Sequence, residues 1–400
     1  MILIDEKTSY FQRIVKRATV LRHQIHAHPE LGFQEHATSQ TIATELKRLG
    51  IAYKTGFAGE TGIVALIEGK SSSKPEKCVA LRADMDALPI TEMTNRPWKS
   101  KCPGRMHACG HDGHTAILLG AAAVLMQRRN DFNGAVKLIF QPAEEALNGG
   151  RRMVKSGALL APNVDAIFGL HGWPHMPIGM VGVKSGTFLA AVDTFNIFIH
   201  GKGSHGAYPH QAIDPIACGA AIVQTLTSLA VSTLSPLETA VLSFGTFNAG
   251  QAINVIPETA ELSGTLRTLS TTARTTMRAA IERTVRTVGA AHRCRVQCRW
   301  GFGTPATVND TAATAHFEQT AAATLGLRRV ERLVEPFLWS EDFAYYLQEI
   351  AGCFFVLGLR PGGAKRYPML HNPEFDFPDA ALPVGIKIMA NLALNYLARE

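Results

Sequence analysis

Hydrophobic positions in the first part of the chain alternate between the spacing of helices and the spacing of strands. Apolar residues recur with a helical period over three stretches, residues 6–27, 37–49 and 114–128. Pro29 follows the first stretch as a helix stop, and Gly50 follows the second as a C-terminal cap. Short continuous apolar runs predict strands at residues 62–67, 78–82, 135–140 and 166–170. Continuous apolar strands separated by helices indicate a mostly parallel sheet covered on both faces.

The middle of the chain has a different pattern. A strand, a helix, two strands, a helix and a strand are predicted at residues 192–200, 215–230, 239–247, 259–268, 271–288 and 294–300. Asp214 and Pro215 mark the start of the first of these helices, while Ser270 opens the second and Gly289 is expected to end it. The order β-α-β-β-α-β is typical of the ferredoxin-like arrangement.

A chain of 400 residues exceeds what one ordinary core holds, so its length predicts two domains, or one large domain carrying an insert. We expect a catalytic domain formed by residues 1–184 and 302–400, interrupted by a lid and dimerisation domain at residues 185–301. The predicted fold class is therefore α/β, a mostly parallel sheet covered by helices, with an inserted α+β ferredoxin-like domain. Residues 71–74 predict a polar loop.

Composition and charge narrow the class of protein. Apolar residues make up 46% and charged residues 18%, which is typical of a globular chain. The formal net charge is +7, but the basic residues are scattered and lack interleaved aromatic residues, so no nucleic-acid partner is expected. The longest helix-like apolar stretch, residues 116–126, is too short to span a membrane.

The distribution of cysteines and the sequence of residues 1–10 predict the cellular location of the protein. The seven cysteines are spread along the chain without the spacing of a disulfide framework. Residues 1–10 lack the apolar region of a signal peptide. We expect a cytoplasmic protein with reduced thiols and no membrane partner.

The densest group of potential metal ligands precedes the third predicted helix. Five side chains that can bind a metal or transfer a proton lie within residues 107–114: His107, Cys109, His111, Asp112 and His114. Cys109 and His111 are two residues apart, so on an extended segment their side chains share one face. Thiolate and imidazole suit zinc, nickel or another transition metal better than magnesium or calcium. A polar loop and a nucleophilic Cys109 activated by a neighbouring His are the alternatives.

Further candidates follow the predicted core strands. Glu144 and Glu145 come directly after the strand at 135–140, where one carboxylate can bind a metal and the other can act as general base. His171 follows the strand at 166–170, and His371 follows an apolar run at 353–359. Asp84 follows the strand at 78–82 and is a candidate for orienting a ligating residue.

These motifs together resemble a known family. RADMDALP, MHACGHDGHTA, QPAEE, LHGWP, GKGSHGAYPH, NVIP, GTLRT and LHNP occur in this order. The order resembles the amidohydrolase branch of the aminoacylase/carboxypeptidase-type metallopeptidases. That branch includes hippurate hydrolases, N-acetyl-diaminopimelate deacetylases and plant indole-acetyl-amino-acid hydrolases. The similarity extends from His26 to the C-terminus.

The resemblance implies a role for each site residue. The implied ligands of a two-metal centre are Cys109, His111, Glu145, His171 and His371. Glu144 would be the general base and Asp84 the acid near the metals. Arg82 stands where wider relatives with an Asp-rich metal set carry a His, so metal identity does not follow from those relatives, and Mn, Zn, Ni or Co remain candidates. In the lid, contacts to the oxyanion and the substrate carboxylate are implied for His205, Asn254 and Arg267.

The expected activity is metal-dependent hydrolysis of the amide bond of N-acyl amino acids, either hippurate-like or N-acetyl. The alternatives are an N-acetyl-diaminopimelate-type deacetylase, a small-peptide hydrolase of the same chemistry, and a non-catalytic metal-binding protein. We also expect a homodimer or dimer of dimers, in which His205 reaches the partner's metal site.

Two other motifs have simpler interpretations. Residues 201–206 satisfy the G-x-G-x-x-G pattern of dinucleotide-binding folds, but Pro209 follows within three residues and the acid expected about 20 residues later is missing. A nucleotide-dependent oxidoreductase is therefore disfavoured. His23, His26 and His28 lie at the end of the first predicted helix, where capping of exposed carbonyls is expected.

Overall fold

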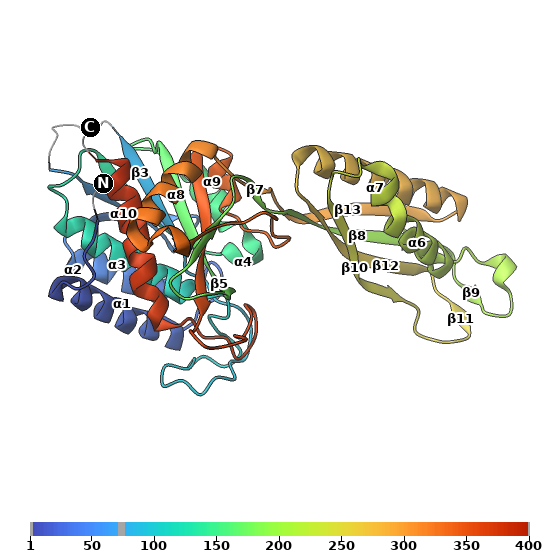
Figure 1. Ribbon diagram of the computed structural model, residues 1–400. Coiled ribbons are helices and arrows are strands. Elements are labelled where there is room, and N and C mark those ends of the chain that lie inside the picture. Colours follow the sequence, from blue (N-terminus) through green and yellow to red (C-terminus); the bar gives the residue numbers. More distant parts are fainter. Residues whose placement is uncertain (1–2, 71–76, 399–400) are drawn as a thin grey trace. The chain divides into compact units, whose positions relative to one another are not determined.

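The computed structural model describes residues 3–70 and 77–398, so the polar loop predicted at residues 71–74 lies outside the described residues (Figure 1). The chain divides into two compact units. The first unit contains Met1–Phe188, Val308–Glu335 and Asp342–Glu400, and the second contains Leu189–Thr307 and Pro336–Glu341. The roles of lid and dimerisation domain remain predictions.

The first unit is built on an eight-stranded sheet. Its strands, in spatial order, are β1 (Ala52–Phe57), β2 (Gly62–Glu68), β4 (Ala135–Gln141), β3 (Cys78–Asp84), β5 (Ala166–Pro177), β16 (Ala351–Arg360), β6 (Val181–Val183) and β15 (Val330–Arg332). The central strands β4, β3, β5 and β16 are parallel, whereas β1–β2, β2–β4 and β16–β6 pair antiparallel. The α/β class is confirmed, with a mixed sheet that has a parallel centre.

Five helices share one hydrophobic core with this sheet. They are α1 (Ser9–Ala27), α2 (His36–Arg48), α3 (His111–Gln127), α8 (Thr311–Leu325) and α10 (Leu382–Tyr396). Helix α3 is apolar on nearly all sides and is almost completely buried, as expected for a helix inside a core. A Cβ on its Gly120 would lie 2.5 Å from Ile386 of α10, so glycine is required for the close approach of these two helices.

Shorter helices complete the first unit. They are α4 (Glu144–Leu147), α5 (Gly149–Lys155) and α9 (Ala344–Leu347). Helix α5 contacts β4, and α9 contacts both α5 and β16. Among the described residues, no helix combines the length and hydrophobicity that a membrane span requires.

The second unit has the predicted ferredoxin-like order. Its elements are β8 (Ala191–His200), α6 (Pro215–Thr233), β10 (Ala240–Ala249), β12 (Thr259–Thr268), α7 (Thr271–Ala291) and β13 (Arg295–Thr304). The antiparallel sheet has the spatial order β10-β12-β8-β13, and α6 and α7 share its core. A short pair of strands, β9 (Ser204–His205) and β11 (Val255–Ile256), lies outside this sheet.

Several predicted element boundaries are wrong. Helix α1 begins at Ser9 and not at residue 6, and β5 continues to Pro177 and not only to residue 170, so His171 lies within the strand and not after it. Helix α7 continues through Gly289 to Ala291, so Gly289 does not end the helix. Glycine at this position instead makes room for Val296, because a Cβ on Gly289 would lie 2.6 Å from Val296 Cγ1. Helix α3 begins at His111, three residues before the predicted start at His114. Residues 201–206 contribute to the β9 strand and not to the start of a helix, which agrees with the rejection of a dinucleotide site.

Candidate metal centre

The candidate residues of the first unit gather at the carboxyl ends of parallel strands. Asp84 is the last residue of β3, Glu144 follows β4 by three residues, and His171 lies within β5. The strands β4, β3 and β5 are neighbours in the sheet, so these side chains meet at one edge. Figure 1 shows α4, which contains Glu144 and Glu145, and β5 in this region of the first unit.

A left-handed turn brings Cys109 and His111 to the same place. Gly110 has φ +91°, and His111 is the first residue of α3. The segment is therefore a turn into a helix, and the predicted extended conformation is wrong. A Cβ on Gly110 would lie 3.0 Å from Phe377, so the position is also closely packed. Cys109 Sγ lies 3.3 Å from His171 Nε2.

Glu145 and His371 complete the cluster. His371 Nε2 lies 3.2 Å from Glu145 Oε1. The backbone N–H of His371 donates to the carbonyl of Ala108 at 2.8 Å, which attaches the His371 segment to the segment that carries Cys109. The Glu145 N–H donates to Asp86 Oδ2 at 3.0 Å.

Five groups of potential ligand atoms lie among the described residues, and three of them contain at least two of the predicted ligands. These three are Cys109, His111 and His171; Cys109, Glu145 and His371; and His111, Glu144 and Glu145, with the atoms of each within 4.8 Å of one another. The structure thus brings together all five residues that the sequence suggested as ligands, together with Glu144.

The donor set fits divalent transition metals. One thiol, three imidazoles and a carboxylate match the ligand preferences of such ions. His111 Nε2 is buried without a hydrogen-bond partner, and its nearest recorded carboxylate oxygen is Asp84 Oδ2 at 3.7 Å. A buried ring nitrogen left free in this way is suited to binding a cation.

Contacts of the Nδ1 atoms orient the imidazole rings of His111 and His171. His111 Nδ1 lies 2.9 Å from the Asp86 carbonyl oxygen and 3.2 Å from Asp86 Oδ1. His171 Nδ1 lies 2.9 Å from the Gly172 carbonyl oxygen. Both contacts favour protonated Nδ1 and leave Nε2 available as a ligand atom. Asp86 lies in the RADMDALP motif, but no role was predicted for it from the sequence.

Asp84 is buried beside the cluster, but its carboxylate contacts His114 and Arg82. Its Oδ1 lies 2.7 Å from His114 Nδ1, and its Oδ2 accepts a hydrogen bond from Arg82 Nη1 at 2.7 Å. His114 Nε2 in turn accepts from the Gly172 N–H at 2.9 Å. His114 is one of the five potential ligands within residues 107–114, but no role of its own was predicted for it.

The negative charges around the site raise the pKa of both His111 and Cys109. Burial lowers the pKa of His111, but the neighbouring carboxylates Asp84 and Asp86 outweigh burial and raise it to about 10. Burial and the negative charges of Glu145 and Glu144 raise the pKa of the Cys109 thiol. A nucleophilic cysteine requires a lowered pKa, so these surroundings argue against that alternative. A bound cation would instead stabilise the thiolate.

Arg82 places a permanent positive charge near the cluster. It is fully buried and donates to Gln141 Oε1, Asp84 Oδ2 and Asp342 Oδ1 at 2.9, 2.7 and 3.2 Å. This guanidinium joins β3, β4 and the segment before α9 beneath the carboxyl edge of the sheet.

The other predicted site residues lie in the second unit. His205 is exposed, and its Nδ1 accepts a hydrogen bond from the Ala207 N–H at 3.0 Å. Asn254 lies near the His205 segment, since its backbone carbonyl accepts a hydrogen bond from the Gly206 N–H at 2.8 Å. Arg267 lies on β12 and donates to Thr265 Oγ1 at 2.9 Å. Their roles remain predictions.

The capping role predicted for two histidines of α1 is wrong. His28 Nδ1 does contact the Gln24 carbonyl at 3.0 Å. His26 is instead buried 2.9 Å from Asp112 Oδ2, and His23 lies 2.9 Å from Asp379 Oδ2. Both acids come from segments distant in the sequence, which helix periodicity does not predict.

Thiol, imidazole and carboxylate groups form a cluster at the carboxyl edge of this sheet, and the chain has a separate α+β unit. These two features together place the chain in the class of metallohydrolases. The family model for peptidase family M20/M25/M40 matches residues 80–395. The chain belongs to this family.

Relatives match the chain over nearly its full length. The N-acetylcysteine deacetylase of Bacillus subtilis (strain 168) is 40% identical and covers 94% of this chain and 96% of its own. The IAA-amino acid hydrolase ILR1-like 2 of Arabidopsis thaliana is 39% identical, covering 95% of this chain and 85% of its own. The crystal structure of the YXEP protein of Bacillus subtilis, described as a dinuclear metal binding peptidase from the M20 family, matches with TM-score 0.82 and 36% identity over 96% of this chain and 99% of that one.

Proposed function

We propose that this protein hydrolyses the amide bond of N-acyl amino acids, either hippurate-like or N-acetyl, and releases a carboxylic acid and an amino acid. The observation that carries the proposal is the cluster of Cys109, His111, Glu145, His171 and His371 with Glu144 beside it. The deacetylase and amino acid hydrolase names of its relatives support the same reaction type.

The five clustered side chains would hold two divalent metal ions, and Mn, Zn, Ni and Co are all compatible with the donor set. Such ions, when bound, polarise an amide carbonyl and increase the acidity of water. Asp86 and Gly172 would keep the His111 and His171 rings in the ligating orientation.

Glu144 would be the general base. It belongs to the same cluster as His111 and Glu145, so its carboxylate lies next to the proposed ligands without being part of the Cys109 groups. Its Oε1 accepts a weak hydrogen bond from the Asp342 N–H at 3.4 Å. The carboxylate would accept a proton from the attacking water and pass it to the nitrogen of the leaving amine.

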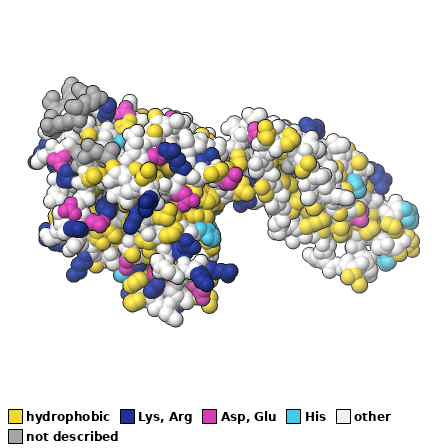
Figure 2. All heavy atoms as spheres, viewed as in Figure 1, with side chains coloured by type: hydrophobic (Ala, Val, Ile, Leu, Met, Phe, Trp, Pro, Cys, Tyr) yellow, Lys and Arg dark blue, Asp and Glu magenta, His cyan; other side chains and the backbone are white. Residues whose placement is uncertain are grey.

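The second unit would bind the substrate and form the dimer. Strand β10 lies at the edge of its sheet and is largely exposed. Helix α6 contains no charged residue and exposes Ile216 and Val231. Figure 2 shows hydrophobic side chains on this part of the second unit. An exposed strand edge next to an apolar helix favours a two-fold contact between copies of the chain.

In such a homodimer, or dimer of dimers, His205 would reach the partner's metal centre and hydrogen-bond the developing oxyanion. Asn254 and Arg267 would contact the oxyanion and the substrate carboxylate, for which a guanidinium fork is well shaped. All seven cysteines are unbridged, which agrees with a proposed location in the reducing cytoplasm.

The test is turnover of a substrate panel by metal-analysed protein. Hippurate, N-acetyl amino acids, indole-acyl amino acids, N-acetyl-diaminopimelate and dipeptides are compared at equal enzyme concentration. Release of amino acid from at least one N-acyl amino acid, with dipeptides cleaved more slowly, is expected. Protein that contains metal but leaves every amide intact would support a non-catalytic metal-binding protein.

A further inference from the structure

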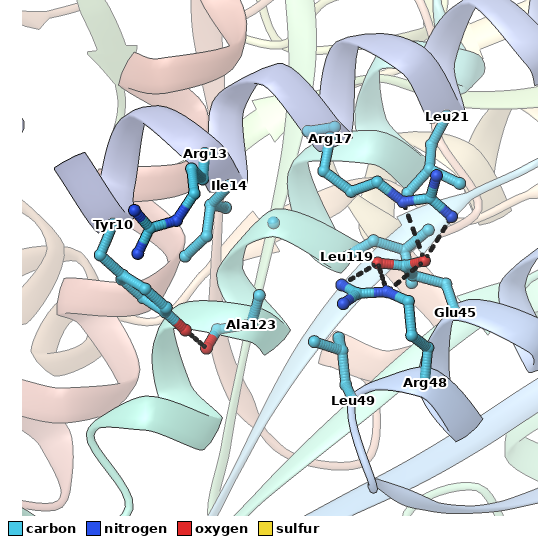
Figure 3. A pocket seen from close by; sticks show the side chains of 12 residues that line it. Tyr10, Arg13, Ile14, Arg17, Leu21, Glu45, Arg48, Leu49, Leu119 and Ala123 are labelled. Atoms are coloured by element: carbon cyan, nitrogen blue, oxygen red, sulfur yellow. Dashed lines mark hydrogen bonds and ion pairs between the residues drawn. The ribbon is translucent and has the colours of Figure 1, made fainter.

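A cavity of about 430 Å³ lies between helices α1, α2 and α3 of the first unit. Figure 3 shows Tyr10 and Arg13 at one end of it and Arg17, Arg48 and Glu45 at the other, with Ile14, Leu119 and Ala123 between them. The volume is in the range of small-molecule sites, about 300–1,000 Å³.

The wall of this cavity is apolar. Ile14 and Leu21 of α1 and Leu119 of α3 line it, and each is buried within the protein core. The small side chains Ala18 and Ala123 contribute to the same wall. Tyr10 closes one end and is held there by its hydroxyl group, which donates to the Ala123 carbonyl at 3.0 Å.

The rim of the cavity carries an excess of positive charge. Arg13, Arg17 and Arg48 face a single acid, Glu45, whose side chain is only 3% exposed. Glu45 accepts hydrogen bonds from Arg17 at 2.8 Å and from Arg48 at 2.6 Å, so one carboxylate holds two guanidinium groups in place. Two positive charges remain without a compensating acid in the lining.

The arginines retain hydrogen-bond donors for a ligand. Arg17 and Arg48 use Nε and Nη2 toward Glu45, and their Nη1 groups have no recorded partner within the described part of the chain. Arg13 makes one weak hydrogen bond, 3.5 Å to Ser9 Oγ, and its guanidinium carbon lies 5.9 Å from the centroid of the Tyr10 ring. A guanidinium offers five N–H donors in a planar fork that matches a carboxylate.

The cavity is separate from the candidate metal centre. Leu119 lies eight residues after His111 on α3. Since a helix rises 1.5 Å per residue, the two positions are separated by about 12 Å along the helix axis.

We propose that this cavity binds a small organic acid with one carboxylate and one compact apolar group, and that the acid contacts Arg48 while its apolar group lies against Ile14 and Leu119. An apolar wall with a cationic rim matches both parts of such a molecule. An inorganic anion would leave the apolar wall exposed to water, and a neutral apolar molecule would leave the excess charge unused.

Crystals of the full-length protein soaked in 4-bromobenzoate locate the ligand by the anomalous signal of bromine. The expected peak lies between α1 and α3, beside Leu119. In calorimetry, Arg48→Gln should weaken 4-bromobenzoate binding by about tenfold or more, because a charge-assisted hydrogen bond is lost. Arg17 would still pair with Glu45 in this variant.

Two comparisons complete the test. Lys47→Gln removes the same charge from an exposed neighbouring position that does not line the cavity, and its affinity should equal that of the wild type. The neutral isostere 4-bromobenzamide should bind more weakly than the acid. Equal affinity of wild type and Arg48→Gln for the acid, or bromine found solely at the Cys109–His111 cluster, would overturn the proposal.

Discussion

Glu144 and Glu145 are adjacent in the sequence but have different surroundings. Glu145 contacts His371, and its backbone N–H is bonded to Asp86, so it is held among the proposed ligands. Glu144 is next to this cluster and contacts the backbone of Asp342. A ligand and a general base respond differently to substitution, which makes the two assignments separable.

Glu144→Gln should reduce kcat by ~10²–10⁴-fold and leave the metal content unchanged, because the amide cannot accept the proton. Glu145→Ala should lose metal as well as activity, because a ligand is removed. Metal analysis and kcat are measured on the same preparations. If both variants keep full metal and similar turnover, the two roles are wrong.

Glu35 shows how a buried residue distant in the sequence affects the same segment. Its Oε1 accepts from the Ala143 N–H at 2.9 Å and its Oε2 accepts from Thr61 Oγ1 at 2.8 Å. Ala143 has φ +55°, a left-handed conformation directly before Glu144. Glu35 therefore helps to hold the turn that positions the two site glutamates.

The stability of the metal-free protein should depend on the ionisation of Glu35. Burial and the nearby Asp86 charge raise the pKa of Glu35 from 4.5 to about 7. A carboxyl group whose pKa rises on folding makes its full contribution to the unfolding free energy of the protein below pH 4.5. This contribution is lost as the pH rises through 7. At 1.36 kcal/mol per pKa unit, the loss of unfolding free energy reaches about 3 kcal/mol.

Denaturant unfolding between pH 4.5 and 8 measures this effect. The wild type should lose stability over that interval relative to Glu35→Gln, which does not ionise. The exposed Glu60→Gln variant should follow the wild type. Parallel pH curves for wild type and Glu35→Gln would show that Glu35 ionises normally in the folded protein.

A buried ion network joins α1 to α3 and to the segment after His371. Arg22 is fully buried and lies 3.3 Å from Asp112, 2.9 Å from Asp376 and 2.7 Å from Asp379. Asp112 follows the proposed ligand His111 directly. The network therefore connects the start of α3 with the chain segment that carries His371.

Arg22→Met should destabilise the first unit by about 3–5 kcal/mol, because Asp112 and Asp376 would lose their buried cation. Lys16→Met, an exposed change on the same helix, should have an effect within about 0.5 kcal/mol. Chemical unfolding of both variants tests the difference. Equal stability would mean that the acids find other partners.

Elements with strong periodicity could be predicted from the sequence, and those set by tertiary contacts could not. The strand at 259–268 matches β12 because its alternation reflects one buried face. Strand β1 was not predicted, since its mostly exposed residues form no apolar run. The start of α3 depends on the left-handed Gly110, and its packing against Phe377 is not visible in local sequence.

The same division applies to the candidate site. Cys109 and His111 could be selected because ligand-type residues are dense before a predicted helix, and Glu145 because it follows a predicted core strand. Asp86 and Glu35 could not be distinguished from turn acids, because their importance comes from hydrogen bonds to residues 25 and 108 positions away.

The proposed dimer predicts that two inactive variants restore activity to each other. His205→Ala and Glu144→Gln should each be nearly inactive alone. After subunit exchange, a mixed dimer holds one site with both residues intact, so part of the activity should return. Mass spectrometry of the mixed dimer confirms the exchange. No recovery after confirmed exchange would mean that His205 does not act on the partner's site.

We propose that amide hydrolysis requires metal held by the cluster of Cys109, His111, Glu145, His171 and His371. The most direct measurement is turnover of the best N-acyl amino acid by chelator-treated protein during titration with Mn²⁺ or Zn²⁺. We predict no turnover without metal and recovery that reaches its plateau at about two equivalents per chain. Full turnover by metal-free protein would show that the reaction does not need a metal ion.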